Sequence, residues 1–224
     1  MNCEGPILGV FGMGGFGSEI IYTLQEGKFR SNELDLSVTD SIKILKVGKQ
    51  DEIETEKDQI SETDFFSSPC EKYFIIAISD IAVRRRLSQL AIMHGAIPIS
   101  IFDKSSSINE ESRIDIGSIT STFSLISTNV EIGKFFHLNV YSYVAHDVKI
   151  GNFVTFGPRV NCNGNIVIGD NVYIGAGASL INGQKGTPLI VGEGAIIGMG
   201  AVVIRDVEPY STMVGNPARA IRKR

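Results

Sequence analysis

From Ile108 onward, apolar residues recur at every sixth position of the chain. An amphipathic helix repeats its apolar positions every three or four residues, and a single strand alternates every two, so neither produces this period. The pattern predicts a short strand followed by a corner, repeated many times. Stepping by six, with Thr120 as the one polar exception, reaches Ile108, Ile114, Thr120, Ile126, Ile132, Leu138, Val144, Ile150, Phe156, Cys162, Ile168, Ile174 and Leu180.

The residue after each of these positions is usually small or prone to turns, as in Gly133, Gly151 and Asn163. Because glycine, asparagine and aspartate adopt conformations that β-branched residues resist, we expect these residues to form the corners. Three hexads would close one triangular coil of about eighteen residues, and coils would stack at the roughly 4.8 Å spacing of neighbouring strands. Residues 106–224 are therefore predicted to be an all-β left-handed parallel β-helix of hexapeptide repeats.

The repeat is interrupted once, by residues 182–188, and resumes at Val191. An insertion of this kind predicts an external loop. Inserted loops on a solenoid often mark its functional face, and a surface excursion without function is the alternative. The final segment, residues 214–224, is predicted to cap the last coil.

The first hundred residues follow a different pattern. An apolar strand is expected at residues 7–11, a helix at 18–27, and between them stands Gly12-Met13-Gly14-Gly15-Phe16-Gly17. A strand, a GxGxxG loop and a helix in this order are typical of phosphate binding, because backbone N–H groups at a helix N-terminus can meet phosphate oxygens.

Further strands are expected at residues 36–38, 73–78 and 96–101, with a helix at 82–93. The polar, acid-rich segment 49–64 is expected to be a surface connection. Together these elements predict a small α/β, Rossmann-like βαβ domain over residues 1–105.

Charge and composition narrow the possible partners. With 21 basic and 25 acidic residues, the net charge of −4 provides no global field to attract nucleic acid or an anionic membrane. No apolar run approaches the roughly 20 residues of a membrane span, and the first residues lack the features of a secretory signal, so a cytoplasmic location is expected. Cys3, Cys70 and Cys162 have unrelated spacings, which predicts three free thiols and no metal site.

Four stretches carry a resemblance to a known family. They are the glycine loop at residues 12–17, the stretch 139–151 around His146-Asp147, the run 163–169, and the closing Gly215-Asn216-Pro217-Ala218. Nearly the whole chain resembles bacterial nucleotide-sugar N-acetyltransferases of the left-handed β-helix superfamily, in particular those acting on UDP- or dTDP-linked 4-amino-4,6-dideoxy sugars of the bacillosamine and perosamine type. These are related to sialic acid O-acetyltransferases.

The resemblance implies a homotrimer with active sites between subunits, acetyl-CoA as co-substrate, and a role in O-antigen, capsule or protein glycan biosynthesis. It also implies that His146 is the general base and that Asp147 orients it or tunes its basicity. An imidazole, whose ordinary pKa is about 6.5, can accept the proton that a sugar ammonium must lose before it attacks a thioester. A surface structural role is the alternative for His146. His137 is the reserve base, and His94, at a predicted helix end, is expected to bond terminal carbonyls.

The remaining site residues also follow from the resemblance. Residues expected to contact the nucleotide sugar are Gly14, Gly15 and Phe16 at the phosphates, Asp40 at the base or ribose, and Asn139 in the sugar pocket. Residues expected along the CoA groove are Gly164, Ala176, Met199 and Gly200, with Arg205 or residues 222–224 at the CoA phosphates. Two departures affect acceptor recognition: Phe16 stands where some relatives have histidine, and Thr39 rather than a second acid precedes Asp40.

The predicted reaction is direct attack of the sugar amine on the thioester, with backbone N–H groups stabilising the oxyanion. It needs neither a metal nor an acyl-enzyme, and Cys162, at an inward position, is a poor nucleophile. Two alternatives remain open from the sequence. One is O-acetylation of a sugar such as a sialic acid. The other is a catalytically silent β-helix scaffold whose first domain binds a nicotinamide dinucleotide.

Overall fold

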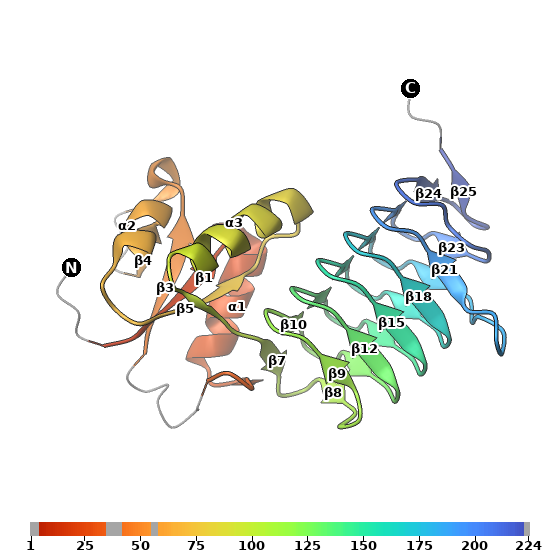
Figure 1. Cartoon of the computed structure of the whole chain (residues 1–224), viewed down its shortest axis with the longest axis horizontal. Coiled ribbons are helices and arrows are strands. Elements are labelled where there is room, and N and C mark those ends of the chain that lie inside the picture. The colour runs from red at the N-terminus through yellow and green to blue at the C-terminus, as the bar shows by residue number, and fades with distance from the viewer. Residues whose placement is uncertain (1–4, 35–41, 55–57, 222–224) are drawn as a thin grey trace. The chain divides into compact units, whose positions relative to one another are not determined.

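A computed structural model describes residues 5–34, 42–54 and 58–221. The chain divides into two compact units, Met1–Phe102 and Asp103–Arg224, which are drawn in Figure 1. The boundary expected from the sequence lay after residue 105. No helix in the described ranges has the length and apolar character needed to span a bilayer.

The first unit is built on a five-stranded parallel sheet in the order β4-β3-β1-β5-β6. Strand β1 lies at its centre, is buried at all five positions, and pairs with β3 on one side and β5 on the other. The strands are β1 (Ile7–Phe11), β3 (Lys43–Gly48), β4 (Gln59–Ser61), β5 (Lys72–Ile76) and β6 (Ile97–Pro98), and the helices are α1 (Gly15–Gln25), α2 (Glu62–Ser67) and α3 (Ile81–Met93). The described residues of this unit also form two short elements, β2 (Phe29–Arg30) and a 3-10 helix η2 (Gln50–Glu52).

Several expectations for this unit are corrected. The expected strand at residues 36–38 lies outside the described residues, and the strand next to β1 is β3, which sequence analysis missed because Lys43 and Lys46 interrupt its apolar pattern. Residues 49–64 are not a plain surface connection, since they contain η2, the edge strand β4 and the start of α2. The single strand expected at 96–101 is divided into β6 and the start of β7 (Ile101–Asp103).

The second unit is a parallel β-helix with three faces. Successive coils pair in register at a spacing of eighteen residues, for example Ile132 with Ile150 and Ile150 with Ile168. The first face holds β10 (Ile119–Thr120), β13 (His137–Leu138), β16 (Thr155–Phe156), β19 (Tyr173–Ile174), β22 (Ile196–Ile197), β24 (Thr212–Val214) and β25 (Arg219–Ala220). The second face holds β8 (Ser107–Ile108), β11 (Leu125–Ile126), β14 (Tyr143–Val144), β17 (Asn161–Cys162), β20 (Ser179–Leu180) and β23 (Val202–Val203). The third face holds β9 (Arg113–Ile114), β12 (Val130–Ile132), β15 (Val148–Ile150), β18 (Ile166–Ile168) and β21 (Leu189–Val191).

One hydrophobic core fills the axis of the β-helix. The aligned apolar residues and the residues four positions after them are buried together, as Val144 and Val148 illustrate at 0% exposure. A single hexad could not bury its apolar side chains alone, so each coil depends on its neighbours for stability. At the C-terminal end, β24 turns back into the antiparallel β25, and Ala218 is buried.

The corners are not formed in the way that the sequence suggested. Left-handed backbone recurs every sixth residue, but three positions after the aligned apolar residue, and it is held mostly by residues other than glycine: Phe123, Asn129, Phe135, Tyr141, Asp147, Phe153, Arg159, Asn165 and Asn171. The small residues directly after the strands serve close packing instead. A Cβ on Gly175 would lie 2.6 Å from the backbone nitrogen of Met199 on the next coil. Aromatic corner residues stack along the axis, with the Phe135 and Phe153 rings 5.0 Å apart, and this contact offsets part of the cost of left-handed backbone.

The two described cysteines differ in state. Cys70 is disulfide-bonded, which corrects the expectation of three free thiols. Cys162 is free and fully buried in the β-helix core, where burial raises the pKa of its thiol. A thiol that is both protonated and inaccessible is a poor nucleophile.

Cys162 should therefore resist alkylation in the native protein. We expect iodoacetamide at pH 8 to leave the Cys162 peptide unmodified in buffer and to label it fully in guanidinium chloride, as measured by peptide mass spectrometry. Labelling should increase on unfolding because burial raises the pKa of the Cys162 thiol, and the reactive thiolate becomes available only when unfolding returns the thiol to water. Rapid labelling of the folded chain would contradict a sealed core.

Candidate active site

His146 and Asp147 occupy the corner between β14 and β15. Asp147 has left-handed backbone (φ 59°), and both side chains project from the solenoid with 57% and 51% of their area exposed. We call this edge of the prism the His146 corner, defined by residues 128–129, 146–147, 164–165 and 182–188, with residues 204–206 at its far end. Backbone hydrogen bonds stack its coils, as from Asn165 N–H to the His146 carbonyl at 3.0 Å.

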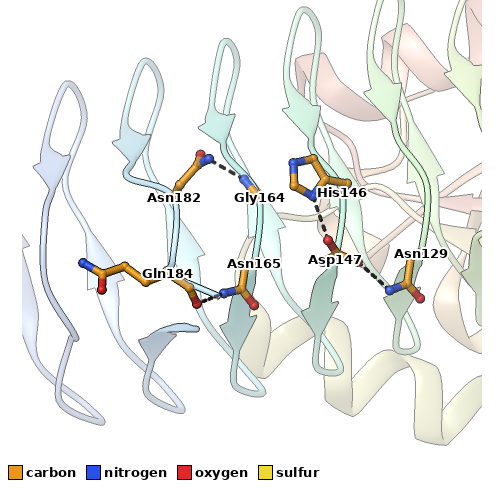
Figure 2. A network of polar contacts seen from close by, with 7 residues as sticks. All are labelled: Asn129, His146, Asp147, Gly164, Asn165, Asn182 and Gln184. Carbon is orange, nitrogen blue, oxygen red and sulfur yellow. Dashed lines mark hydrogen bonds and ion pairs between the residues drawn. The ribbon is translucent and has the colours of Figure 1, made fainter. Parts of the chain in front are cut away.

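Figure 2 shows a chain of polar contacts along this corner. The Nδ1 atom of His146 lies 2.8 Å from Oδ2 of Asp147, and the other carboxylate oxygen accepts a hydrogen bond from the side-chain amide of Asn129 at 2.6 Å. The Asn129 amide first, and then His146, hold the pKa of Asp147 below its usual range. An ionised carboxylate can only accept, so Nδ1 of neutral His146 carries the hydrogen and Nε2 keeps its lone pair.

Gly164 lies against the His146 ring from the next coil. A Cβ on Gly164 would be 2.6 Å from Cε1 and 2.8 Å from Nε2 of His146, so any larger residue would displace the ring. The Gly164 N–H in turn donates to Oδ1 of Asn182 at 3.2 Å. Glycine is therefore needed here to give the imidazole its position.

The loop at residues 182–188 leaves the solenoid at the same corner, two coils beyond His146. Paired backbone hydrogen bonds between Gln184 and Thr187 close it, and the Asn165 side-chain amide donates to the Gln184 carbonyl. Figure 2 shows Asn182 and Gln184 on the coil next to Gly164 and Asn165. The insertion predicted from the sequence thus lies on the same corner as the histidine, two coils away along the solenoid axis.

The CoA and sugar residues expected in the second unit divide between two corners. Gly164 and Arg205 lie on the His146 corner, Arg205 between β23 and the bridge that joins Val207 to Val191. A second edge, which we call the Ala176 corner, comprises residues 139–142, 157–160, 175–178 and 198–201. It holds the other four, namely Asn139, Ala176, Met199 and Gly200, so a single chain does not bring these residues to the histidine.

Two of the residues on the Ala176 corner differ in how they meet their surroundings. Asn139 is half-buried, and its amide donates to the Phe156 carbonyl at 2.8 Å. Met199 is 80% exposed.

The glycines of the loop at residues 12–17 have two different roles. Gly12, with φ of 135°, and Gly17 are packing positions, because a Cβ on Gly17 would lie 1.9 Å from the Gly12 carbonyl oxygen. Gly14 and Gly15 face open space, and Gly14 caps α1 without a side chain. Phe16 is half-buried, and Asp40 lies outside the described residues, as do residues 222–224.

The other two histidines do not take part in this site. His137 is fully buried, which rules it out as a reserve base. His94 caps the C-terminus of α3 as expected, with its backbone N–H donating to the Leu90 carbonyl at 3.0 Å, while its ring stacks on Phe66 at 5.1 Å. Asn129 and Asn182 were not expected at the site from the sequence, although Asn129 lies eighteen residues, one coil, before Asp147 and Asn182 lies one coil after Gly164.

The site consists of an outward imidazole bonded to a carboxylate on a corner of a parallel β-helix, and the only free described thiol lies away from it. This arrangement defines an acyltransferase of the β-helix class. No family model matches the sequence. The chain is 42% identical over 218 residues to the GDP-perosamine N-acetyltransferase of Escherichia coli O157:H7, covering 97% of each chain. It therefore belongs to the family of nucleotide-sugar N-acetyltransferases.

Solved structures share the fold over nearly the full length. WeeI from Acinetobacter baumannii AYE superposes with a TM-score of 0.87 at 39% identity, covering 96% of this chain and 100% of that one. PerB from Caulobacter crescentus, in complex with CoA and GDP-perosamine, superposes with a TM-score of 0.80 at 20% identity, covering 98% of this chain and 99% of that one. In the described part of the present chain, no group of three or more His, Cys, Asp or Glu side chains could hold a metal ion.

Proposed function

We propose that this enzyme transfers the acetyl group of acetyl-CoA to the 4-amino group of a nucleotide-linked 4-amino-4,6-dideoxy sugar. The observation that carries the proposal is the exposed His146 ring, whose Nδ1 is engaged by Asp147 and whose Nε2 is left to accept a proton. The amine lone pair attacks the thioester carbon, and Nε2 takes the amine proton. When the C–S bond breaks, the imidazolium returns that proton to the CoA thiolate. Asp147 stabilises the transient imidazolium throughout.

The first candidate substrate is GDP-perosamine. The full-length relative from Escherichia coli is named for that sugar, and the chain matches it over 97% of both lengths. The UDP- and dTDP-linked 4-amino sugars expected from the sequence are the next candidates. Cytoplasmic glycan biosynthesis is the setting that follows from such a substrate.

The first unit is proposed to be a Rossmann-like domain that binds the nucleotide sugar. Its sheet order reverses around β1, and the glycine loop leaves the carboxyl end of that strand, where doubly wound sheets place their ligands. Open space around Gly14 and Gly15 suits the approach of phosphates to the N-terminus of α1. Phe16 and Asp40 are proposed to contact the same ligand.

The second unit is proposed to wind left-handed and to form homotrimers. The expected CoA residues lie on two different corners, with Gly164 and Arg205 on one and Ala176, Met199 and Gly200 on the other. Two neighbouring subunits that bring unlike corners together would complete one CoA groove between them. Asn139, on the Ala176 corner, would reach the sugar at a neighbour's His146 in the same way. Sedimentation equilibrium tests this assembly, and a monomer fully active at its assay concentration contradicts it.

The activity is tested by incubating the full chain with acetyl-CoA and GDP-, UDP- or dTDP-linked 4-amino sugars. We expect CoA thiol to be released and one acetyl unit to be added to the sugar nucleotide by mass spectrometry. The product amide should survive mild alkali. An alkali-labile product formed only with hydroxyl acceptors would indicate O-acetylation instead, and tight NAD binding without thiol release would indicate a silent scaffold.

The two kinds of glycine in the loop predict opposite effects of alanine. Gly14→Ala should leave the melting temperature nearly unchanged but raise KM for the nucleotide sugar about tenfold, because the methyl group occupies space that a phosphate needs. Gly17→Ala should lower the free energy of unfolding by about 1–3 kcal/mol, because its Cβ collides with the Gly12 carbonyl. Thermal melts and steady-state kinetics of the pair check both. An unchanged KM in Gly14→Ala would remove the loop from the phosphate site.

A further inference from the structure

Asn129 stands one coil before the catalytic pair and faces it. Figure 2 shows Asn129 on one coil and Asp147 with His146 on the next, with dashed contacts from Asn129 to Asp147 and from Asp147 to His146. The two hydrogen bonds that join them measure 2.6 and 2.8 Å, and each uses a different oxygen of the Asp147 carboxylate. The carboxylate therefore has its rotation fixed at both ends.

Within the single chain, neither member of the catalytic pair is held by burial. More than half of the His146 and Asp147 side chains is exposed, and an exposed ion pair by itself gives little positional order. Within the described residues, the hydrogen bonds to the Asp147 side chain come from the imidazole itself and from the Asn129 amide. The Asn129 amide is thus the contact that can anchor the carboxylate to the solenoid.

The backbone does not by itself explain an amide at this position. Asn129 has φ of 52°, but the equivalent corner positions 123, 135 and 141 carry Phe, Phe and Tyr with nearly the same backbone. Those side chains stack on aromatic neighbours one coil away, whereas residue 129 lies below a carboxylate. A hydrogen-bond donor is what this particular neighbour requires.

We infer that Asn129 is a positioning residue for the catalytic base. Its amide holds Asp147 so that Oδ2 meets Nδ1 of His146, which selects the Nδ1–H tautomer and directs Nε2 toward the acceptor amine. The inference rests on the proposed function for its kinetic consequence, but its structural consequence can be measured without substrate.

The test variant is Asn129→Gly, which removes the amide and tolerates positive φ. The kcat of acetyl transfer should fall about tenfold, because the variant loses one hydrogen bond to a charged group. The KM for acetyl-CoA should stay unchanged. In protein labelled with 15N-histidine, which has three histidines, the His146 signals should move toward a mixture of both tautomers. Asn129→Asp, similar in shape but without the donor, should also fail to support the wild-type rate.

Asn171→Gly is the matched control. Asn171 also has left-handed backbone (φ 61°), and its amide faces a carboxylate on the next coil, Glu193, at 3.4 Å, but at a corner without a histidine. If corner amides only tie coils together, both glycine variants should lower stability alike and neither should alter transfer. We expect Asn171→Gly to keep the wild-type kcat and the wild-type His146 signals.

A double-mutant cycle tests whether Asn129 affects the reaction through Asp147 or by another route. In an Asp147→Ala background, Asn129→Gly should cause no further loss of kcat. An equal tenfold loss in that background, or wild-type kcat and tautomer signals in Asn129→Gly alone, would overturn the inference. If the wild-type chain acetylates no amino sugar but its His146 signals still respond to Asn129→Gly, the proposed function fails and the positioning role stands.

Discussion

Replacing His146 with alanine is expected to lower kcat/KM for acetyl transfer by about 10²- to 10⁴-fold, the usual contribution of a positioned general base. Among the described histidines, only His146 is both exposed and bonded to a carboxylate. Without it, the attacking amine has no proton acceptor beside the thioester. Affinity for acetyl-CoA, measured by titration calorimetry, should change little.

His94→Ala provides the control for this experiment. His94 lies in the first unit, where its ring stacks on Phe66, so its loss should leave transfer intact. Raising the pH should restore part of the activity of His146→Ala, because a larger fraction of the sugar amine is then already neutral. Retention of most of the wild-type rate at neutral pH would show that another group, or water alone, accepts the proton.

Gly164→Ala is expected to lower kcat by about 100-fold while the chain stays folded, since a displacement of about 1 Å in a catalytic group can cost that much. The added methyl would stand 2.6 Å from Cε1 of His146. Because that ring is the exposed end of a flexible side chain, it will rotate away and the coils will keep their register. Kinetics and thermal melting of the same preparation check both halves of the expectation.

The matched background for this variant is His146→Ala, in which no ring remains to collide. Adding Gly164→Ala there should alter neither the residual rate nor the melting temperature. The kinetic constants also separate two roles of Gly164: a lower kcat indicates a displaced base, and a raised KM for acetyl-CoA indicates an obstructed groove. A wild-type kcat in Gly164→Ala would show that the ring position seen here is not the catalytic one.

The β-helix was largely predictable because its signal is local and repeated. Each hexad must turn its own apolar residue inward, so the register of Ile132 on Ile150 and Ile168 can be read from the spacing alone. The same register places residue 146 beyond an inward Val144 at a corner, which is why the exposure of His146 was foreseeable. Strand β3 gave no such signal, since Lys43 and Lys46 conceal its pattern and its burial depends on β1 and β4.

The sequence by itself therefore determined the coil, its register and the exposed histidine with its acid, because a period of six constrains every turn in the same way. Tertiary structure decided which side chains meet along a corner. Asn129, Asp147, Gly164 and Asn182 come from four successive coils, and their contacts depend on the stacking of those coils and on left-handed backbone at Asn129 and Asp147. It also decided that the left-handed corner positions lie three residues after the aligned apolar residue and include aromatic side chains, because stacking between coils offsets a backbone cost that the sequence pattern assigned to glycine, asparagine and aspartate.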